Sequence, residues 1–407
     1  MFEPSAAFLV ALLGALVTPQ EAAGEAGRAA PNEVEARESG SRSPEARGLD
    51  RAAAERALDQ LLCHLVSSQR PDGSWCAPVP DNLFDSGFPL PAYAAYQQAA
   101  HAVGLLALME APPRAEREAA LEAGLDWLCR STPAVRASDW DVDSTWGSLY
   151  GFVACVRAAA DPRFQGASSQ GQLERAGLRF YADLERRQTP DGGWAYYDDR
   201  PYSERPKWAT SFCTALVLPA LLEAEARGWA VDTGVARRAR RLVRRCALPN
   251  GAYAYSFGHL ASGHGGESID QVPGSLGRIQ VCQWALARAG DPRVAIEDLR
   301  AGLERFFDQH AYLDLVRLRP LPHEGWFANA GYFYFFGHYY AALAIELLPA
   351  AEREPWRRQL RHHVAKTITA DGSCNDFPSS SFMTHASTSF AALALVAGLP
   401  PQPEVLQ

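Results

Sequence analysis

The segment Gln69-Arg-Pro-Asp-Gly-Ser-Trp75 returns 119 residues later as Gln188-Thr-Pro-Asp-Gly-Gly-Trp194. Weaker copies are present at Leu248-Pro-Asn-Gly-Ala-Tyr253 and at Thr369-Ala-Asp-Gly-Ser-Cys374. A short segment that recurs between helical stretches is typical of a repeated architecture. The four copies therefore predict a fold built from several similar units.

The residue types of this segment indicate a structural role. Pro71 and Pro190 forbid an uninterrupted helix. The following Asp-Gly or Asn-Gly stops a helix, because glycine reaches the left-handed conformation that satisfies the last carbonyls. The aromatic residue two positions further on is large and amphipathic, and is suited to wedge between helical pairs. We interpret the segment as a structural clasp and not as a catalytic element.

From residue 49 onward, two kinds of helix alternate. Helices with one polar face are expected within 50–67, 115–130, 171–188, 233–247, 296–310 and 356–368. Helices that are apolar on every side are expected within 94–109, 144–160, 210–222, 274–289, 331–348 and 384–396. The apolar helices must be enclosed, and an open stack would leave two apolar ends. The pattern predicts an all-α protein, a single α/α toroid of about six helical hairpins over residues 49–400, with the apolar helices forming the inner ring.

Composition excludes several classes of function. The chain has 407 residues, 47% of them hydrophobic, and a net charge of −8, which argues against a nucleic-acid partner. None of the expected apolar ranges contains 18 uncharged residues, so no transmembrane span is expected, although peripheral membrane contact stays open. The sequence carries no signal for a particular oligomeric state.

The first 48 residues differ in composition from the remainder. Residues 6–17 form an apolar run of the length of a signal-peptide core, followed by a small-residue cleavage pattern at Ala22-Ala-Gly24. The basic residues that usually precede such a run are missing, so an ordinary flexible tail or a misassigned start is the alternative. We expect a signal peptide at 1–24, a disordered spacer at 25–48, a tail at 401–407, and export to the periplasm or the extracellular space.

Six of the eight cysteines fall within the expected helices, and a core of this size needs no disulfides. We expect buried free thiols at Cys63, Cys129, Cys155, Cys213, Cys246 and Cys282. No Cys-x-x-Cys pair occurs, so neither a structural zinc site nor any cofactor is expected.

Over residues 49–400 the chain resembles the superfamily of terpenoid cyclases and protein prenyltransferases. The resemblance is carried by the segments at 69–75 and 188–194, which are similar to the QW motifs of squalene and hopene cyclases. It implies an α/α toroid and an isoprenoid-like ligand in a central cavity.

The resemblance also implies a general acid, an Asp side chain that protonates the substrate. Class II triterpene cyclases carry an Asp-Val-Asp-Asp-Thr-Ala segment whose middle Asp protonates the substrate. The matching segment here is Asp141-Val-Asp-Ser-Thr-Trp146, so Asp143 takes the position of the acid and Asp141 that of its charge partner. Ser144 replaces the last Asp. The alternative is structural, because Asp143 or Ser144 before an apolar helix is typical of a helix N-cap.

Two other enzymatic classes use similar rings. A zinc-dependent prenyltransferase would need an Asp-x-Cys segment and a His as metal ligands. The candidates are Cys374, Asp376 and His385, which lie close together in the sequence, and Asp270, which precedes Cys282. No Asp-x-Cys segment occurs among them. A carbohydrate-active ring would need two facing carboxylates, and the connecting segments supply Asp198, Asp199, Glu267, Asp270, Glu324 and Asp376.

Aromatic residues gather on or just before the expected inner helices. The candidate binding residues are Trp146, Tyr150, Trp208, Phe212, Trp326, Tyr332 and His385. Aromatic faces can line an apolar cavity and stabilise an isoprenoid or cationic ligand, or they can simply fill the ring as core. We predict a protein that binds or transforms an apolar small molecule. The alternatives are a non-catalytic toroid for protein or glycan binding and a carbohydrate-active enzyme.

Overall fold

The structure is a computed structural model that describes residues 49–135, 144–195, 208–257 and 268–399. The expected signal peptide, spacer and tail lie outside these residues and stay predictions, as does export. Within the described ranges, no helix is both long and apolar enough to pass through a lipid bilayer.

The predicted alternation of helices is confirmed. The outer helices are α3 (Arg51–Ser68), α5 (Ala115–Arg130), α7 (Ala167–Arg187), α9 (Thr233–Arg245), α11 (Ile296–Asp308) and α14 (Ala350–Ala365). The inner helices are α4 (Leu90–Glu110), α6 (Thr145–Ala160), α8 (Ser211–Ala226), α10 (Arg278–Arg288), α13 (Phe333–Ile345) and α15 (Phe382–Ala397). The sequence pattern did not predict the short helix α12 (Ala311–Val316) or the 3-10 turns η2 (Asp85–Gly87), η3 (Pro162–Phe164), η4 (Pro273–Ser275) and η5 (Trp326–Ala328).

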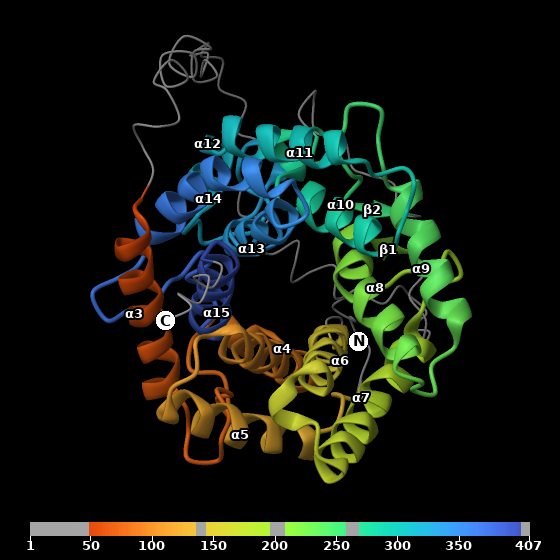
Figure 1. The fold of residues 1–407 in the computed structure, drawn as a ribbon, viewed down its shortest axis with the longest axis vertical. Coiled ribbons are helices and arrows are strands. Elements are labelled where there is room, and N and C mark those ends of the chain that lie inside the picture. Colours follow the sequence, from red (N-terminus) through yellow and green to blue (C-terminus); the bar gives the residue numbers. More distant parts are fainter. Residues whose placement is uncertain (1–48, 136–143, 196–207, 258–267, 400–407) are drawn as a thin grey trace, which may run out of the picture. The chain divides into compact units, whose positions relative to one another are not determined.

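The inner helices form a closed ring (Figure 1). Each of them packs against the next one along the chain, and α15 packs back against α4. The outer layer is closed as well, because its last helix, α14, contacts its first, α3. Closure buries the apolar ends that an open stack would expose. The chain therefore has the predicted α/α toroid fold.

The four copies of the clasp form the same turn. In each copy, the backbone N–H of the first turn residue donates to a carbonyl four residues later, and the N–H of the glycine donates back to the carbonyl of that first residue. The glycines all have positive φ, which L side chains adopt only with strain. They are Gly73, Gly192, Gly251 and Gly372, with φ of 88°, 107°, 82° and 82°.

Each clasp glycine lies against the next outer helix of the ring. A Cβ on Gly73 would come within 2.4 Å of the Ala123 carbonyl oxygen on α5, and one on Gly192 within 2.6 Å of the Arg238 carbonyl oxygen on α9. Gly251 lies against Arg305 on α11. Gly372 lies against the Gln60 carbonyl oxygen on α3, the first outer helix. The fourth copy therefore closes the ring in the way that the other copies join its neighbours.

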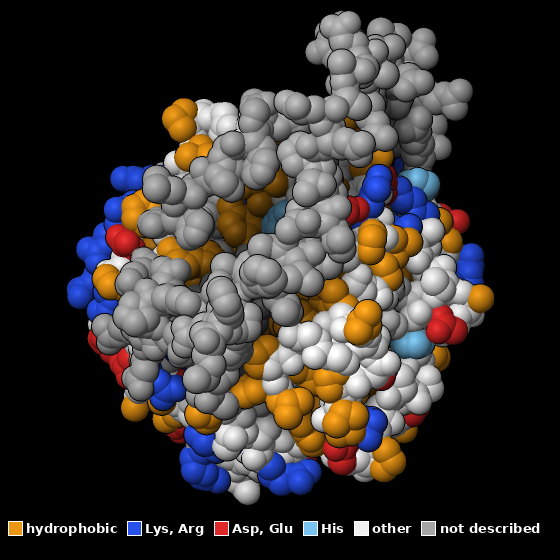
Figure 2. Space-filling view, turned by 180° about the vertical axis from the view of Figure 1, so that it is seen from behind, with side chains coloured by type: hydrophobic (Ala, Val, Ile, Leu, Met, Phe, Trp, Pro, Cys, Tyr) orange, Lys and Arg blue, Asp and Glu red, His pale blue; other side chains and the backbone are white. Residues whose placement is uncertain are grey.

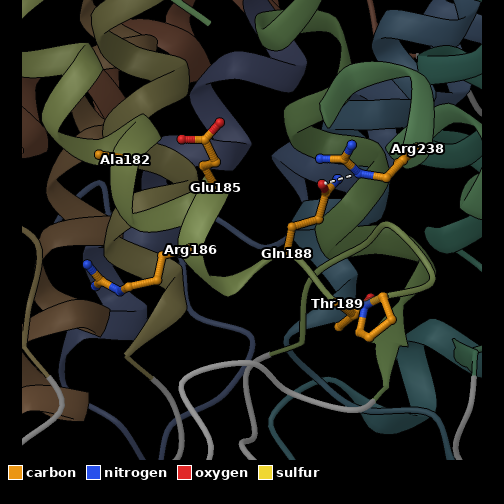
Figure 3. Close-up of a pocket in the computed structure, with 7 residues that line it drawn as sticks. Ala182, Glu185, Arg186, Gln188, Thr189 and Arg238 are labelled. Carbon is orange, nitrogen blue, oxygen red and sulfur yellow. Dashed lines mark hydrogen bonds between the residues drawn. The ribbon is translucent and has the colours of Figure 1, made fainter. Parts of the chain in front are cut away.

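The glutamine and tryptophan of the two complete clasps have the same contacts. The Trp75 and Trp194 indoles are buried and donate to the carbonyls of Leu65 and Leu184, both at 2.8 Å. The Gln188 amide donates to the carbonyls of Gly192 and Val235, and its oxygen accepts from Arg238 Nε at 2.8 Å. A surface hollow beside this glutamine is lined by residues of α7, α9 and the clasp (Figure 3). Since the Gln188 amide is engaged by the protein itself, we interpret the hollow as part of the structural clasp.

Two very short strands connect a clasp to the inner ring. Strand β1 (Ala209–Thr210) pairs antiparallel with β2 (Ser256–Phe257), with Ala209 opposite Phe257, and Trp194 bridges to Thr210. Elsewhere, Asp85 Oδ2 accepts from the Ser381 backbone N–H at 2.8 Å, which joins the segment before the first inner helix to the start of the last one.

All eight cysteines are free, and five of the six expected buried thiols are buried. The expectation is wrong for Cys63, which is exposed because its side chain lies on the polar face of outer helix α3.

Candidate ligand site at the mouth of the inner ring

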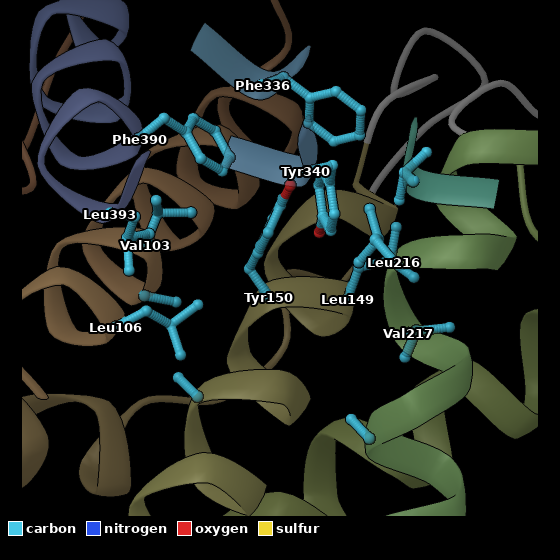
Figure 4. Close-up of a cluster of buried hydrophobic side chains, with 14 of the residues drawn as sticks. Val103, Leu106, Leu149, Tyr150, Leu216, Val217, Phe336, Tyr340, Phe390 and Leu393 are labelled. Atoms are coloured by element: carbon cyan, nitrogen blue, oxygen red, sulfur yellow. The ribbon is translucent and has the colours of Figure 1, made fainter. Parts of the chain in front are cut away.

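The centre of the inner ring is filled by aromatic side chains. Tyr150, Phe336, Tyr340 and Phe390 come from α6, α13 and α15 and are each at most 8% exposed. Their rings lie 4.7–6.0 Å apart, and aliphatic side chains of the inner helices lie beside them (Figure 4). We call these four residues the deep layer. It is packed as core, so the ring is not an open channel at this depth.

A second aromatic group lies near the start of the inner helices. The Trp146 ring stacks on Tyr150 and lies 6.1 Å from Phe212, which contacts Tyr255 and Phe333. Tyr332 contacts Phe333 in turn. We call Trp146, Phe212, Tyr255, Tyr332 and Phe333 the rim layer. Figure 2 shows hydrophobic side chains gathered on one face of the molecule.

The rim layer is more accessible than the deep layer. Trp146, Tyr255 and Tyr332 are half-buried, whereas Phe212 and Phe333 are almost fully buried between them. Half-buried rings above a closed aromatic floor suit a ligand that rests on the mouth of the ring. They suit less well a ligand that the ring encloses completely.

Arg278 is a fully buried cation directly behind the rim layer. Its guanidinium lies over the rings of Tyr255 and Phe333, with Cζ at 5.2 and 5.5 Å from their centres. It donates to the carbonyls of Gly274 and Ile269, and its Nε is buried without a hydrogen-bond partner among the described residues. Burial lowers the pKa of Arg278, and the Asp270 carboxylate opposes that shift. Two rim rings are therefore polarised by a positive charge on their inner side.

A histidine and a tyrosine are hydrogen-bonded to each other at the rim. His323 Nδ1 lies 2.7 Å from the Ala328 carbonyl and must donate to it, so Nε2 accepts from the Tyr332 hydroxyl at 2.8 Å. Burial lowers the pKa of His323, although the Ala328 carbonyl opposes the shift, so the ring is neutral at pH 7. A neutral imidazole on a phenol can take up its proton.

The segment that holds His323 is strained. Among the described residues, every non-glycine residue with positive φ lies in it: Leu318, His323, Phe327 and Ala328, with φ between 50° and 66°. Such conformations cost on the order of 1–2 kcal/mol each and concentrate at functional sites. The backbone strain of the described residues is therefore concentrated on the His323 side of the rim.

Asp376 is a buried carboxyl behind this segment. Its Oδ1 accepts from Ser387 Oγ at 2.7 Å, and its Oδ2 accepts from the Phe335 backbone N–H in the first turn of α13. Burial raises the pKa of Asp376 to about 7, although both hydrogen bonds oppose the shift. Because the side chain is sealed and both oxygens are engaged, we assign Asp376 a structural role between α13 and α15.

The raised pKa of Asp376 makes stability depend on pH. The folded chain keeps this proton up to about pH 7, whereas the unfolded chain loses it near its ordinary pKa of 3.8. Between these values the folded state binds more protons, so the free energy of unfolding falls as the pH rises. We expect ionisation of Asp376 to lower the free energy of unfolding by about 4 kcal/mol between pH 4 and pH 8. Urea titrations should show a shallower fall for Asp376→Asn; identical pH profiles for the two proteins would contradict the assignment.

The structure describes most of the remaining predicted residues. Asp141 and Asp143 are outside the described residues. Ser144 stands at the N-cap position of α6, but its Oγ accepts from Arg187 Nη1 at 2.7 Å and caps no backbone N–H. Trp208 is buried just before β1, and Trp326 is half-buried in the strained segment. The His385 ring lies 6.5 Å from His64 of outer helix α3 and so faces the wall of the ring.

The residues considered for the alternative enzymes do not converge where they are described. Cys374 contacts Thr367, Asp376 contacts Ser387, and His385 lies near His64, so no prenyltransferase-like metal set forms among them. Of the acidic residues, Asp270 accepts from the Tyr255 N–H, and Glu324 lies 3.9 Å from Arg319. Asp198, Asp199 and Glu267 are outside the described residues.

The sequence did not single out Arg278, His323, Tyr255 or Phe333. Arg278 is one of many arginines, and His323 and Tyr255 lie in connecting segments without a regular pattern. The only available signal was the aromatic run at 332–336, of which Tyr332 was selected.

Comparisons with known proteins support the fold. No protein-family model and no curated protein matches the sequence. An inactive variant of the alpha-1,6-mannanase GH76A of Salegentibacter sp. HEL1_6, in complex with alpha-1,6-mannotriose, has a TM-score of 0.53 and 14% identity over 85% of this chain and 98% of its own. A possible member of the GH105 family from Klebsiella pneumoniae has a TM-score of 0.51 and 13% identity over 86% and 94%.

The type II terpene cyclase MstE from Scytonema, in complex with merosterolic acid A, is 15% identical over 86% of this chain and 98% of its own. Its TM-score of 0.45 supports no conclusion about this chain. The mannanase and the GH105 protein are similar in fold alone, because identities of 13–14% say nothing about the reaction. The chain therefore has the α/α toroid fold that the resemblance to terpenoid cyclases and prenyltransferases implied.

Proposed function

We propose that the chain binds an apolar, isoprenoid-like small molecule on the rim layer at the mouth of the inner ring. The observation that carries this proposal is the continuous aromatic group of Trp146, Phe212 and Tyr255, which come from separate elements. Trp146 and Tyr255 remain half-buried, and the buried Phe212 lies between them. A ligand that covered these rings would bury apolar area.

The charge behind the rim narrows the class of ligand. Arg278 occupies the inner faces of Tyr255 and Phe333, so these rings attract a second cation less strongly than free rings do. On this side of the mouth, a neutral chain or one that ends in an anionic group is favoured over a cationic ligand. A prenyl alcohol and a prenyl diphosphate represent these two classes.

Transformation of the ligand would need an acid, and Asp143 with Asp141 as its charge partner remains the proposed one. Asp143 precedes Trp146 of the rim layer by three residues in the chain. The His323–Tyr332 pair offers a second group for proton transfer on the opposite side of the rim.

A binding experiment tests the proposal. Purified protein is titrated with geranylgeraniol, geranylgeranyl diphosphate and alpha-1,6-mannotriose, and binding is followed by native mass spectrometry. We expect a prenyl compound to bind, and Trp146→Ala to weaken its affinity at least about tenfold, because the largest half-buried ring of the rim is lost.

The matched control is Trp356→Ala on outer helix α14, where the indole is also half-buried but stacks on Phe307. It should leave the affinity unchanged. Binding of mannotriose alone would favour the glycan alternative, and no binding of either prenyl compound would reject the proposal. If prenyl compounds bind, comparison of products from wild type and Asp143→Asn separates a catalyst from a carrier.

A further inference from the structure

Three histidines meet in the wall of the ring, away from the mouth. His310 lies between α11 and α12, His338 in the middle of inner helix α13, and His363 near the end of outer helix α14. One ring nitrogen from each lies within 4.8 Å of those from the other two. His310 and His338 are at most 3% exposed, and His363 is half-buried.

The hydrogen bonds around two of these histidines define where their protons are. His338 Nδ1 lies 2.7 Å from the Tyr334 carbonyl, which can only accept, so Nδ1 carries the proton. His310 Nδ1 lies 3.0 Å from Asp314 Oδ2, and the carboxylate requires the same tautomer. Lys366 Nζ lies 3.0 Å from Asp314 Oδ1, so the carboxylate is paired with a cation as well as with His310.

This arrangement directs two lone pairs at each other. The remaining nitrogens, His310 Nε2 and His338 Nε2, are 3.0 Å apart. Two neutral imidazoles in these tautomers repel at that distance, and only a proton or a metal ion between them removes the conflict.

The third histidine adds a further unpaired nitrogen. His363 Nδ1 is buried and has no hydrogen-bond partner among the described residues. Its ring centre lies 3.5 Å from that of His310. A buried ring nitrogen without a partner is uncommon in a native structure and needs an explanation.

We propose that His310, His338 and His363 bind a divalent transition-metal ion, of which Zn²⁺ is the best match. Three neutral imidazoles are a typical ligand set for zinc, and tetrahedral bonds of 2.0–2.1 Å place two ligand nitrogens about 3.3 Å apart, close to the 3.0 Å between the two Nε2 atoms. Asp314 and the Tyr334 carbonyl orient His310 and His338 from behind, as partners of metal-bound histidines do.

The site would join three elements of the wall. It connects the α11–α12 junction and outer helix α14 to inner helix α13, and the Lys366–Asp314 ion pair at 3.0 Å lies beside it. Because the ligands are buried, we assign the ion a structural role. The sequence led to the expectation of no metal because the ligands are 28 and 25 residues apart and match no zinc motif.

Metal analysis and thermal unfolding of the full chain test this site. After removal of metal by chelation, Zn²⁺ should rebind at one ion per chain and raise Tm by about 5 °C at a zinc concentration roughly 100 times Kd. Co²⁺ should give the visible absorption of a tetrahedral site. His338→Gln and His363→Gln should each abolish stoichiometric binding, whereas His64→Gln, at a histidine outside the cluster, should retain it.

His338→Gln and His363→Gln are measured separately, so one variant still tests the site if the other fails to fold. Metal below a tenth of an equivalent in the wild type after saturation, with no shift of Tm, would overturn the proposal. Equal zinc content in wild type and both cluster variants would also overturn it. NMR can also show whether His310 is protonated in the metal-free protein. If it is, and if its signals do not change when zinc is added, a proton and not a metal occupies the position between His310 and His338.

Discussion

Replacing Trp194 by alanine is expected to destabilise the ring more than any other single change considered above. The indole is fully buried between α7 and the start of α8, and its Nε1 donates to the Leu184 carbonyl at 2.8 Å. Removal of a buried tryptophan leaves a cavity and costs about 3–5 kcal/mol, and the unpaired carbonyl adds about 1 kcal/mol or more. Urea denaturation followed by circular dichroism should show a correspondingly lower midpoint.

Two further variants show how much of this loss of stability comes from the hydrogen bond and how much from the position of the tryptophan in the clasp. Trp194→Phe keeps much of the apolar volume but loses the donor, so we expect an intermediate loss of about 1–2 kcal/mol. Trp356→Ala removes a half-buried indole from outer helix α14 and should cost less than Trp194→Ala. If Trp194→Ala and Trp356→Ala had the same effect, the clasp would not be the main element that joins neighbouring hairpins.

Gly372→Ala is expected to weaken the closure of the ring. Gly372 has a φ of 82°, and a Cβ there would come within 2.6 Å of the Gln60 carbonyl oxygen on α3. The conformational strain costs about 1 kcal/mol, and the close approach to backbone forces the last clasp away from the first outer helix. We expect a total loss of about 3 kcal/mol or more in the free energy of unfolding.

The chain contains a matched control for this change. Gly228 has a φ of 79°, but a Cβ at Gly228 would meet nothing within 4 Å. Gly228→Ala therefore carries the strain without the clash and should cost about 1 kcal/mol. Equal losses in the two variants would mean that the contact of the last clasp with α3 contributes nothing, and that the ring is closed by the packing of α14 and α15 against α3 and α4.

The helical hairpins could be predicted from the sequence because their signals are local. The expected apolar helix at 144–160 corresponds to α6 (Thr145–Ala160), and the expected polar-faced helix at 115–130 to α5 (Ala115–Arg130). Side-chain periodicity follows from 3.6 residues per turn, and the Pro, Asp and Gly of the clasp act within a few residues. The clasp itself was also predicted correctly as structural, because glycine and proline have restricted roles in turns.

The mouth of the ring could be predicted only in part. Trp146, Phe212 and Tyr332 were selected because aromatic residues on apolar helices are visible in the sequence. Their grouping with Tyr255, His323 and Arg278 was not predictable, since these residues come from connecting segments and from a helix far along the chain. His385 lies in the first turn of inner helix α15, and its ring lies 6.5 Å from that of His64 on α3.

Burial and long-range contact account for the remaining differences. Asp376 looked like any acidic residue of a connecting segment, and only its enclosure between α13 and α15 raises its pKa. His310, His338 and His363 carry no motif, and the ring brings them together by packing α14 against α13.

Local periodicity and the recurring clasp were thus enough to predict the hairpins, their number and their closure into a ring. Which side chains meet across the ring depends on the rotation of each helix about its own axis. That rotation results from packing over the whole ring, so it cannot be predicted from a short stretch of sequence. The packed deep layer, the rim layer, the charge behind it and the histidine cluster therefore became visible only when the helices were in place.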